Sequence, residues 1–300
     1  MATNEQVLRQ IINILSVNLQ RETKVGLLQG KMGMVILFYL YSRYTGDKRY
    51  EYFPDEYLDK IERYMSMRSV ISIAEGLGGI GWGIDYMIKE GFIEADDDVL
   101  EDVDAEVAGE MNSEKFLKDV EAKLPLFSKG VYFLQRGNPG IVKESLLEVF
   151  NLIRMNPEIN LPLTYINSIV YVALVSLKMK PQSESYDELL DYLYKIVADY
   201  KREKIDSHNY FLLKKNISLM NEYHASKWNV LVKGAHQLYD AHECYWIDFL
   251  FPEGERIPVD IEKTQSWLNS YLQNFDYENM SVYKGLTGVG LAIMSTKQQY

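Results

Sequence analysis

One pattern occurs three times in this sequence and constrains its fold more than any other feature. Two glycines spaced as Gly-x-x-Gly are followed directly by an apolar, helix-like segment at residues 30–38, 76–87 and 285–294. A repeated unit of this kind predicts a repeat architecture. Glycine at these positions allows a sharp turn and lets helix starts crowd together where a Cβ atom would clash.

The spacing of the three copies indicates what lies between them. The first two begin at Gly30 and Gly76, 46 residues apart, which is room for an inner helix, a returning outer helix and their loops. The third begins at Gly285, 209 residues after the second. This distance corresponds to between four and five such periods, so we expect the middle repeats to be present but degenerate.

Helical periodicity extends along the whole chain. A capping box at residues 3–6 opens the first helix, and a second is predicted at 185–188. The segments 34–41, 80–87 and 165–177 are apolar on most faces, as buried inner helices are. Amphipathic helices are expected at 4–20, 55–65, from 97 onward, around 116–124, and at 139–155, 189–197, 209–224, 226–242 and 258–272. No strand-like alternation is sustained, so we predict an all-α fold, an α/α toroid of inner and outer helices.

Composition narrows the class of protein. A chain of 300 residues with 47% hydrophobic content and no Pro/Ser/Gly-rich linker is expected to form a single domain over residues 1–300. A net charge of −11 without a basic stripe argues against a nucleic-acid partner. The acidic run at 94–110 contains nine carboxylates but keeps valines and leucine at helical spacing, which favours a solvated helix face over a metal or partner site.

Cysteine usage and hydropathy bear on location. The single cysteine, Cys244, excludes an internal disulfide framework and fits a reducing compartment. The polar first residues do not resemble a signal peptide, and the longest apolar stretch, 32–41, is far shorter than the ~20 residues of a membrane helix. We expect a soluble, cytoplasmic protein without a membrane partner.

The glycine turns, the phrase Gly-Ile-Gly-Trp-Gly at 79–83 and the closing segment 285–292 resemble the lanthionine synthetase C-like family. The resemblance is firm over residues 26–107 and 281–296 and topological between them. It implies an α/α toroid. Active members close thioether rings in ribosomally made peptides, using a zinc ion held by two cysteines and a histidine to activate the thiol.

The zinc motifs of that family, Cys-x-Gly and Cys-His-Gly, do not occur here. Cys244 is followed by neither glycine nor histidine, so no zinc ligand can be assigned by resemblance. A rearranged site of Cys244 with His236 and His242 is disfavoured, because a spacing of six places the histidines on different helix faces. The resemblance therefore implies a relative without zinc-dependent cyclase chemistry and without a cofactor. Such a relative would bind a ribosomally synthesised peptide or a modification enzyme.

Three residues just after the glycine turns, Lys31, Trp82 and Asp85, are the predicted substrate-binding positions, and no catalytic residue is assigned. An alternative is an α/α-barrel carbohydrate-active enzyme, which needs two acids facing one cavity, with Asp85 and Glu75 as candidates. Asp85 either points inward or pairs with Lys89 at i+4, and Glu75 is also simply an acid favoured near a helix start.

Aromatic residues are the last candidates for a binding surface. The 23 tyrosines, with Trp82 and Trp246, either line a groove for a peptide or glycan or pack in the core. The glycine clusters lack the Gly-Lys-Ser/Thr ending of a phosphate loop, and no Ser/His/Asp triad is readable around the four histidines.

Overall fold

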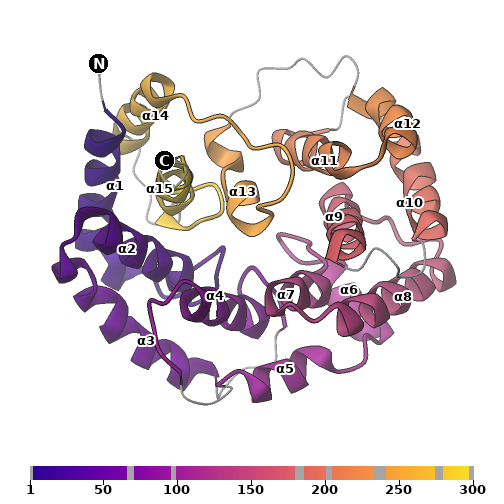
Figure 1. Cartoon of the computed structure of the whole chain (residues 1–300), viewed down its shortest axis with the longest axis horizontal. Coiled ribbons are helices and arrows are strands. Elements are labelled where there is room, and N and C mark those ends of the chain that lie inside the picture. Colours follow the sequence, from indigo (N-terminus) through magenta and orange to yellow (C-terminus); the bar gives the residue numbers. More distant parts are fainter. Residues whose placement is uncertain are drawn as a thin grey trace. The chain divides into compact units, whose positions relative to one another are not determined.

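The structure is a computed structural model that describes residues 3–65, 71–95, 99–179, 186–200, 205–232, 241–273 and 280–296. In these ranges the regular secondary structure is helical, and the only β-type pairing is an isolated bridge between Val25 and Gly30. The predicted all-α class is therefore confirmed (Figure 1). Among the same residues, no helix is both long and apolar enough to cross a membrane.

The chain divides into two compact units. Unit 1 comprises Met1–Val99, Asp240–Leu250 and Ile257–Tyr300, and unit 2 comprises Leu100–Tyr239 and Phe251–Arg256. All three glycine motifs fall in unit 1. The single domain expected from composition stays a prediction.

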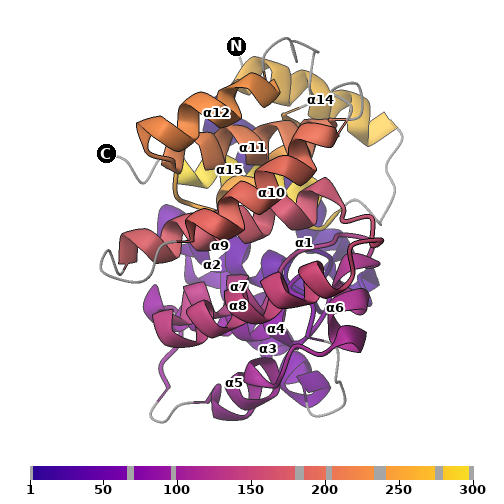
Figure 2. The ribbon, with the colours of Figure 1, turned by 90° about the vertical axis from the view of Figure 1, so that its right-hand side faces the viewer.

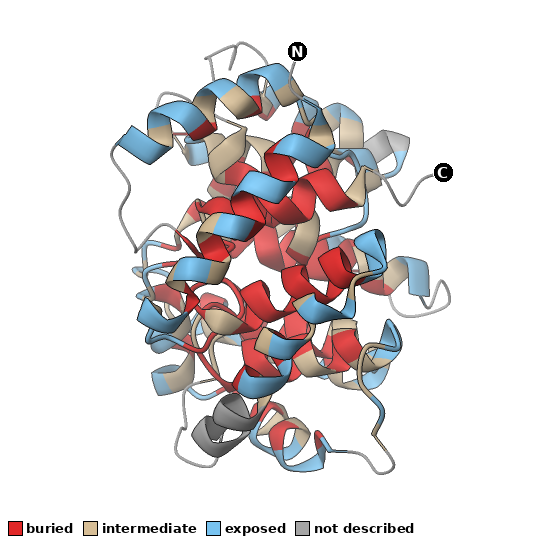
Figure 3. Cartoon of the chain, turned by 90° about the vertical axis from the view of Figure 1, so that its left-hand side faces the viewer, coloured by how far each residue is buried: buried red, intermediate tan, exposed pale blue. Residues whose placement is uncertain are grey.

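Unit 1 combines buried and amphipathic helices. The helices α2, α4 and α15 are buried along most of their length, whereas α1 buries one face and exposes the other. Figure 3 shows this contrast as continuous red on interior helices and alternating red and blue on surface helices. Burial on most sides explains why the segments 34–41 and 80–87 are apolar on most faces. The helices are α1 (Asn4–Asn18), α2 (Lys31–Thr45), α3 (Tyr52–Met65), α4 (Leu77–Lys89), α13 (Trp246–Leu250), α14 (Ile261–Gln273) and α15 (Leu286–Ser295), with short 3₁₀ turns at Leu19–Arg21, Lys48–Tyr50 and His242–Cys244.

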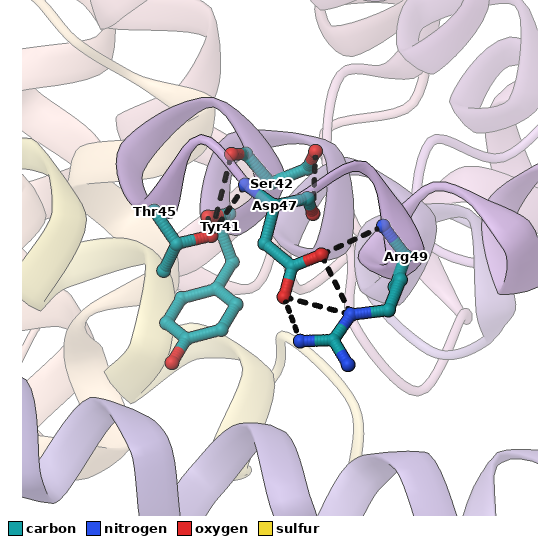
Figure 4. Close-up of polar contacts among 5 residues, drawn as sticks. All are labelled: Tyr41, Ser42, Thr45, Asp47 and Arg49. Carbon is teal, nitrogen blue, oxygen red and sulfur yellow. Dashed lines mark hydrogen bonds and ion pairs between the residues drawn. The ribbon is translucent and has the colours of Figure 1, made fainter.

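Hydrogen bonds close the turn that follows α2 (Figure 4). Thr45 Oγ1 donates to the carbonyl of Tyr41 at 2.9 Å and accepts from the amide of Asp47 at 3.3 Å. The Asp47 carboxylate accepts from the Arg49 side chain at 2.6–3.0 Å, and these bonds hold the pKa of Asp47 below its usual value. Ser42 Oγ donates to the Asp47 carbonyl at 3.2 Å. The Asp47 carboxylate also accepts from the backbone amide of Arg49 at 3.0 Å, which makes Asp47 the N-cap of the 3₁₀ turn Lys48–Tyr50, so the cluster includes a helix cap.

Unit 2 contains eight helices within the described residues, and Figure 2 faces the side on which α8, α10 and α12 lie. Of these helices α9 is the most buried, and α7, α8, α10 and α11 all contact it. It is the apolar segment predicted at 165–177. The eight are α5 (Glu101–Ala108), α6 (Ser113–Val120), α7 (Ser128–Arg136), α8 (Pro139–Met155), α9 (Leu163–Met179), α10 (Asp187–Asp199), α11 (Ser207–Leu219) and α12 (Glu222–Val232).

Several helices begin or end at the residues predicted from their capping residues. Thr3 and Gln6 form the predicted capping box of α1. Pro139 begins α8, which ends at Met155, and the Asp260 carboxylate accepts amides of the first turn of α14. At the second predicted capping box Ser185 lies outside the described residues, and Tyr186 is the N-cap of α10 without a side-chain cap bond.

Three predicted helix boundaries are wrong. The helix expected at 209–224 ends at Leu219, because the chain breaks at Met220 and restarts with Asn221 capping the amide of His224 at 3.1 Å. The helix expected at 226–242 is described only to Val232, and residue 242 belongs to a 3₁₀ turn. Leu124 lies beyond the end of α6.

The acidic run at 94–110 contributes α5, which begins at Glu101 and not near residue 97, although residues 96–98 are not described. Val103 and Val107 are buried, and most of the described acids of the run are exposed, as a solvated helix face requires. Asp104 differs, since Arg136 binds its carboxylate.

Candidate functional site

The three glycine motifs share one local geometry. In each motif the second glycine lies against the carbonyl oxygen of the residue six positions upstream. A Cβ atom on that glycine would lie only 2.0–2.5 Å from the oxygen, closer than any real Cβ contact. The pairs are Gly33 with Leu27, Gly79 with Ile73, and Gly288 with Val282. Glycine is therefore required at these positions because loop and helix approach too closely for a side chain.

The preceding loop also closes each helix start. The amide of Met32 donates to the Val25 carbonyl at 3.3 Å, and the amide of Gly78 donates to the Ile71 carbonyl at 3.2 Å. Both acceptors lie seven residues upstream. At the same relative position in the third motif, the hydroxyl of Thr287 donates to the carbonyl of Met280. The first-turn amides of Met32 and Gly78 are therefore already bonded within the protein and are not available to a phosphate.

Backbone hydrogen bonds join the three loops. The amides of Leu28 and Gln29 donate to the Ala74 carbonyl at 3.2 and 3.1 Å. The amide of Tyr283 donates to the Leu28 carbonyl at 2.9 Å. The loop before α2 thus contacts the loops before α4 and α15, and three helix starts gather in one place within unit 1.

A long polar side chain precedes the first glycine of every motif: Gln29, Glu75 and Lys284. The ammonium of Lys24 joins two of them, since Nζ lies 3.5 Å from Gln29 Oε1 and 3.3 Å from Glu75 Oε1. We call Lys24, Gln29, Glu75 and Lys284 the glycine-turn cluster. It is the best-defined group of polar side chains at the helix starts.

Burial differs sharply within this cluster. The side chains of Lys24 and Glu75 are 52% and 44% exposed, so their ion pair contributes at most about 1 kcal/mol to stability. Gln29 is only 6% exposed, and its Nε2 has no hydrogen-bond partner among the described residues. A buried polar atom without a partner is uncommon in native proteins and calls for an explanation.

Lys284 is unusual in its backbone. Its φ of 59° makes it the one non-glycine residue with positive φ in the described part of the chain. This left-handed conformation costs about 1–2 kcal/mol in an L-residue, and such strain concentrates at functional sites. Its Nζ lies 3.3 Å from Oε2 of Glu243 and 5.5 Å from the centre of the Tyr283 ring.

Of the three predicted binding residues, only Lys31 lies at a helix start. Lys31 is the first residue of α2, and its Nζ lies over the ring of Tyr57 on α3, 4.5 Å from the ring centre. Trp82 lies further along α4 and is 3% exposed. It stacks on Tyr86 with ring centres 5.5 Å apart and meets Phe249 edge to face at 5.2 Å. Burial, as the main cause, raises the pKa of Tyr86 to about 12.

Asp85 and Glu75, the acids considered for carbohydrate chemistry, each contact a lysine. Asp85 is 4% exposed, and its Oδ2 lies 2.8 Å from Nζ of Lys89, which is the i+4 pairing weighed from the sequence. Glu75 contacts Lys24 from the residue before the N-cap of α4. Trp246, like Trp82, is buried and packs edge to face on Tyr283, which is a core role.

The residues considered for zinc have other neighbours. His242 stacks on Trp267, and its Nε2 lies 3.2 Å from Thr264 Oγ1. Cys244 is fully buried and is not part of a disulfide, and His236 lies outside the described residues. Across the described ranges, no three His, Cys, Asp or Glu side chains are grouped so that they could hold a metal ion.

A second group of titratable residues lies in unit 2. The carboxylate of Asp119 on α6 accepts from the amide of Ser128, the first residue of α7, at 3.4 Å. Removal of this carboxylate from water raises the pKa of Asp119 to about 7, although the hydrogen bonds from Ser128 act in the opposite direction. Tyr165 is fully buried, and burial followed by the charge of Asp119 raises its pKa well above 10.

Sequence periodicity missed the glycine-turn cluster, although a signal was present. Aligning the motifs on their first glycine shows an apolar residue three positions upstream and a long polar residue directly upstream in each copy. Comparisons of the chain with models of known protein families, with curated proteins and with solved structures returned no match.

Proposed function

We propose that the chain is a lanthionine synthetase C-like α/α toroid of the cytoplasm that binds a peptide at the glycine-turn cluster and lacks zinc-dependent cyclase activity. The observation that carries this proposal is the repeated geometry of the glycine motifs. In three segments far apart in sequence, the second glycine of the motif lies against the carbonyl oxygen of the residue six positions upstream. Unrelated loops would not share this contact by chance.

The chemistry of the helix starts supports a binding role. The resemblance implies that substrates of this family are handled at the starts of inner helices. In this chain that place holds two lysines, a glutamate and a buried amide. Such a mixed polar group suits the carbonyls, amides and termini of a peptide. The contacts of Asp85 do not favour the carbohydrate-active alternative, because Lys89 holds its carboxylate.

A labelled peptide tests both halves of the proposal. A fluorescein-labelled peptide carrying one dehydrobutyrine and one cysteine is titrated with the protein, and its anisotropy is followed while a thiol-reactive dye measures the free cysteine. We expect saturable binding without loss of the thiol beyond the protein-free rate. Absence of saturable binding contradicts the binding role, and accelerated thiol loss contradicts the non-catalytic assignment. If a modification enzyme is the true partner, the peptide alone fails to bind.

A further inference from the structure

Gln29 holds a hydrogen-bond donor that the described part of the protein does not use. The ammonium of Lys24 can only donate, so the amide atom of Gln29 that faces it at 3.5 Å is the oxygen. The Nε2 group is then a buried donor with no acceptor among the described residues. Such a donor favours a ligand that brings an acceptor oxygen.

Lys24, which contacts Gln29, also contacts a carboxylate of the same cluster. Glu75 Oε1 lies 3.3 Å from Lys24 Nζ, so the ammonium that contacts Gln29 also binds an acid of the protein. The starts of α2 and α4 carry partial positive charge, which favours negative groups there. Because the amides of Met32 and Gly78 are already bonded, side chains and not the backbone would contact an added anion.

We propose that Lys24 and Gln29 form a subsite for a carboxylate of the bound peptide, and that Glu75 occupies Lys24 when no peptide is bound. The subsite rests on the proposed peptide-binding function and names the group that is recognised. Lys24 supplies the positive charge, and Gln29 Nε2 donates to the second carboxylate oxygen. An amidated terminus offers only one acceptor oxygen, so its NH2 group must face one of the two donors, and the subsite discriminates against it.

The exchange of carboxylates is possible because the Lys24–Glu75 pair is weakly held. Both side chains are about half exposed, and water competes for both. When the Lys24–Glu75 ion pair breaks, Lys24 remains beside Gln29. The carboxylate of the ligand then takes the place of the Glu75 carboxylate on Lys24. Glu75 is therefore a competitor of the ligand, and its neutralisation strengthens binding.

Three forms of one peptide test this subsite by anisotropy: a free acid without acidic side chains, its C-terminal amide, and an amide with one added glutamate. We expect the free acid to bind wild type about tenfold or more tightly than the plain amide, as hydrogen bonds to a charged group allow. Lys24→Met and Gln29→Leu should abolish this preference. With that preference present, tight binding of the glutamate-containing amide shows that the subsite also accepts a side-chain carboxylate, and weak binding restricts it to the C-terminus.

The Glu75→Gln variant is the most decisive test. It should bind the free acid about three- to tenfold more tightly than wild type does, and misfolding cannot produce a gain of affinity. The exposed pair Lys118 and Glu114 on α6, 2.7 Å apart, supplies matched controls. Lys118→Met and Glu114→Gln change the same charges and should leave all three affinities unchanged.

Three results would contradict parts of this proposal. If wild type binds the plain amide as tightly as both acidic forms, the subsite is wrong while peptide binding stands. If Glu75→Gln leaves the affinity for the free acid unchanged or weakens it, the competitor role is wrong. If wild type binds none of the three peptides, the proposed function itself has failed, and the subsite with it.

Discussion

Nζ of Lys24 lies 3.3 Å from Oε1 of Glu75, so a lysine of the loop before α2 and a glutamate of the loop before α4 meet at the start of both helices. These residues are 51 positions apart in sequence. Their contact depends on the backbone hydrogen bonds from Leu28 and Gln29 to Ala74, which fix the two loops side by side. Loop packing, made possible by the glycines, therefore positions the candidate site.

Gly79→Ala should destabilise the protein by about 2 kcal/mol, because the new Cβ would lie 2.0 Å from the carbonyl oxygen of Ile73 and force helix and loop apart. Helix propensity alone would give the opposite sign, a gain of up to about 1 kcal/mol. Urea unfolding followed by helical circular dichroism measures the change.

Gly140→Ala in the first turn of α8 is the matched control. Its Cβ would meet only Asn138 Oδ1 at an ordinary 3.5 Å, so we expect a neutral effect or a stabilisation below about 1 kcal/mol. Equal effects of the two substitutions would refute the close-approach argument.

Asp104→Ala should lower the free energy of unfolding by about 2 kcal/mol. Its carboxylate accepts from Nε and Nη2 of Arg136 at 2.6–3.1 Å and from the hydroxyl of Tyr132 at 2.6 Å, in a site only 17–27% exposed. Glu114→Ala removes an acid from an exposed pair and should lower the stability much less than Asp104→Ala does. Chemical denaturation of both variants measures the loss of stability. A loss for Asp104→Ala no larger than that for Glu114→Ala would contradict a stabilising role for the contacts of Asp104 with Arg136 and Tyr132.

Asp119 should make stability fall as pH rises from about 4 to 7. Its pKa of about 7 in the folded protein exceeds the 3.8 of a free side chain, so folding favours the protonated form. That contribution is complete below pH 3.8 and is lost as pH rises through 7. Asp119→Asn should therefore be more stable than wild type at pH 8, by roughly 1–2 kcal/mol since part of the residue is in water, and by a smaller margin at pH 5, where only part of the contribution has been lost.

Thermal unfolding at pH 5 and pH 8 measures this difference. Asp199→Asn removes the same charge from an exposed position on α10 and should shift the melting temperature equally at both pH values. A pH-independent effect of Asp119→Asn would mean that its carboxylate is not desolvated in the folded protein.

Zinc content should not depend on Cys244. The thiol is fully buried, and the nearby His242 places its Nε2 3.2 Å from Thr264 Oγ1. Elemental analysis of wild type and Cys244→Ala, both purified without chelator, should give less than stoichiometric zinc in each. About one zinc per chain that is lost in the variant would restore thiol-activating chemistry.

Periodicity and capping chemistry predicted most helices, since the spacing of apolar residues reports which faces are buried. The ends of α8 followed from Pro139 and the apolar pattern. The break between α11 and α12 was missed because neither glycine nor proline marks it, although Asn221 is a good N-cap residue. Trp82 and Asp85 were predicted from their distance to a glycine turn, but the direction of a side chain depends on its packing partners.

The glycine-turn cluster could not be predicted from periodicity, because contacts between loops of different repeats leave no helical or strand period. Gln29 shows the difficulty. Its place before Gly30 was visible, but its burial depends on how the loops before α2, α4 and α15 pack.

Hydrogen–deuterium exchange with and without the dehydrobutyrine–cysteine peptide tests the central claim most directly. Peptide binding at the glycine-turn cluster predicts slower exchange in the loops at 24–31, 72–76 and 281–285. The exposed helix α6 should be unchanged. Saturable binding that protects other segments and leaves all three loops unaffected would contradict the proposed site.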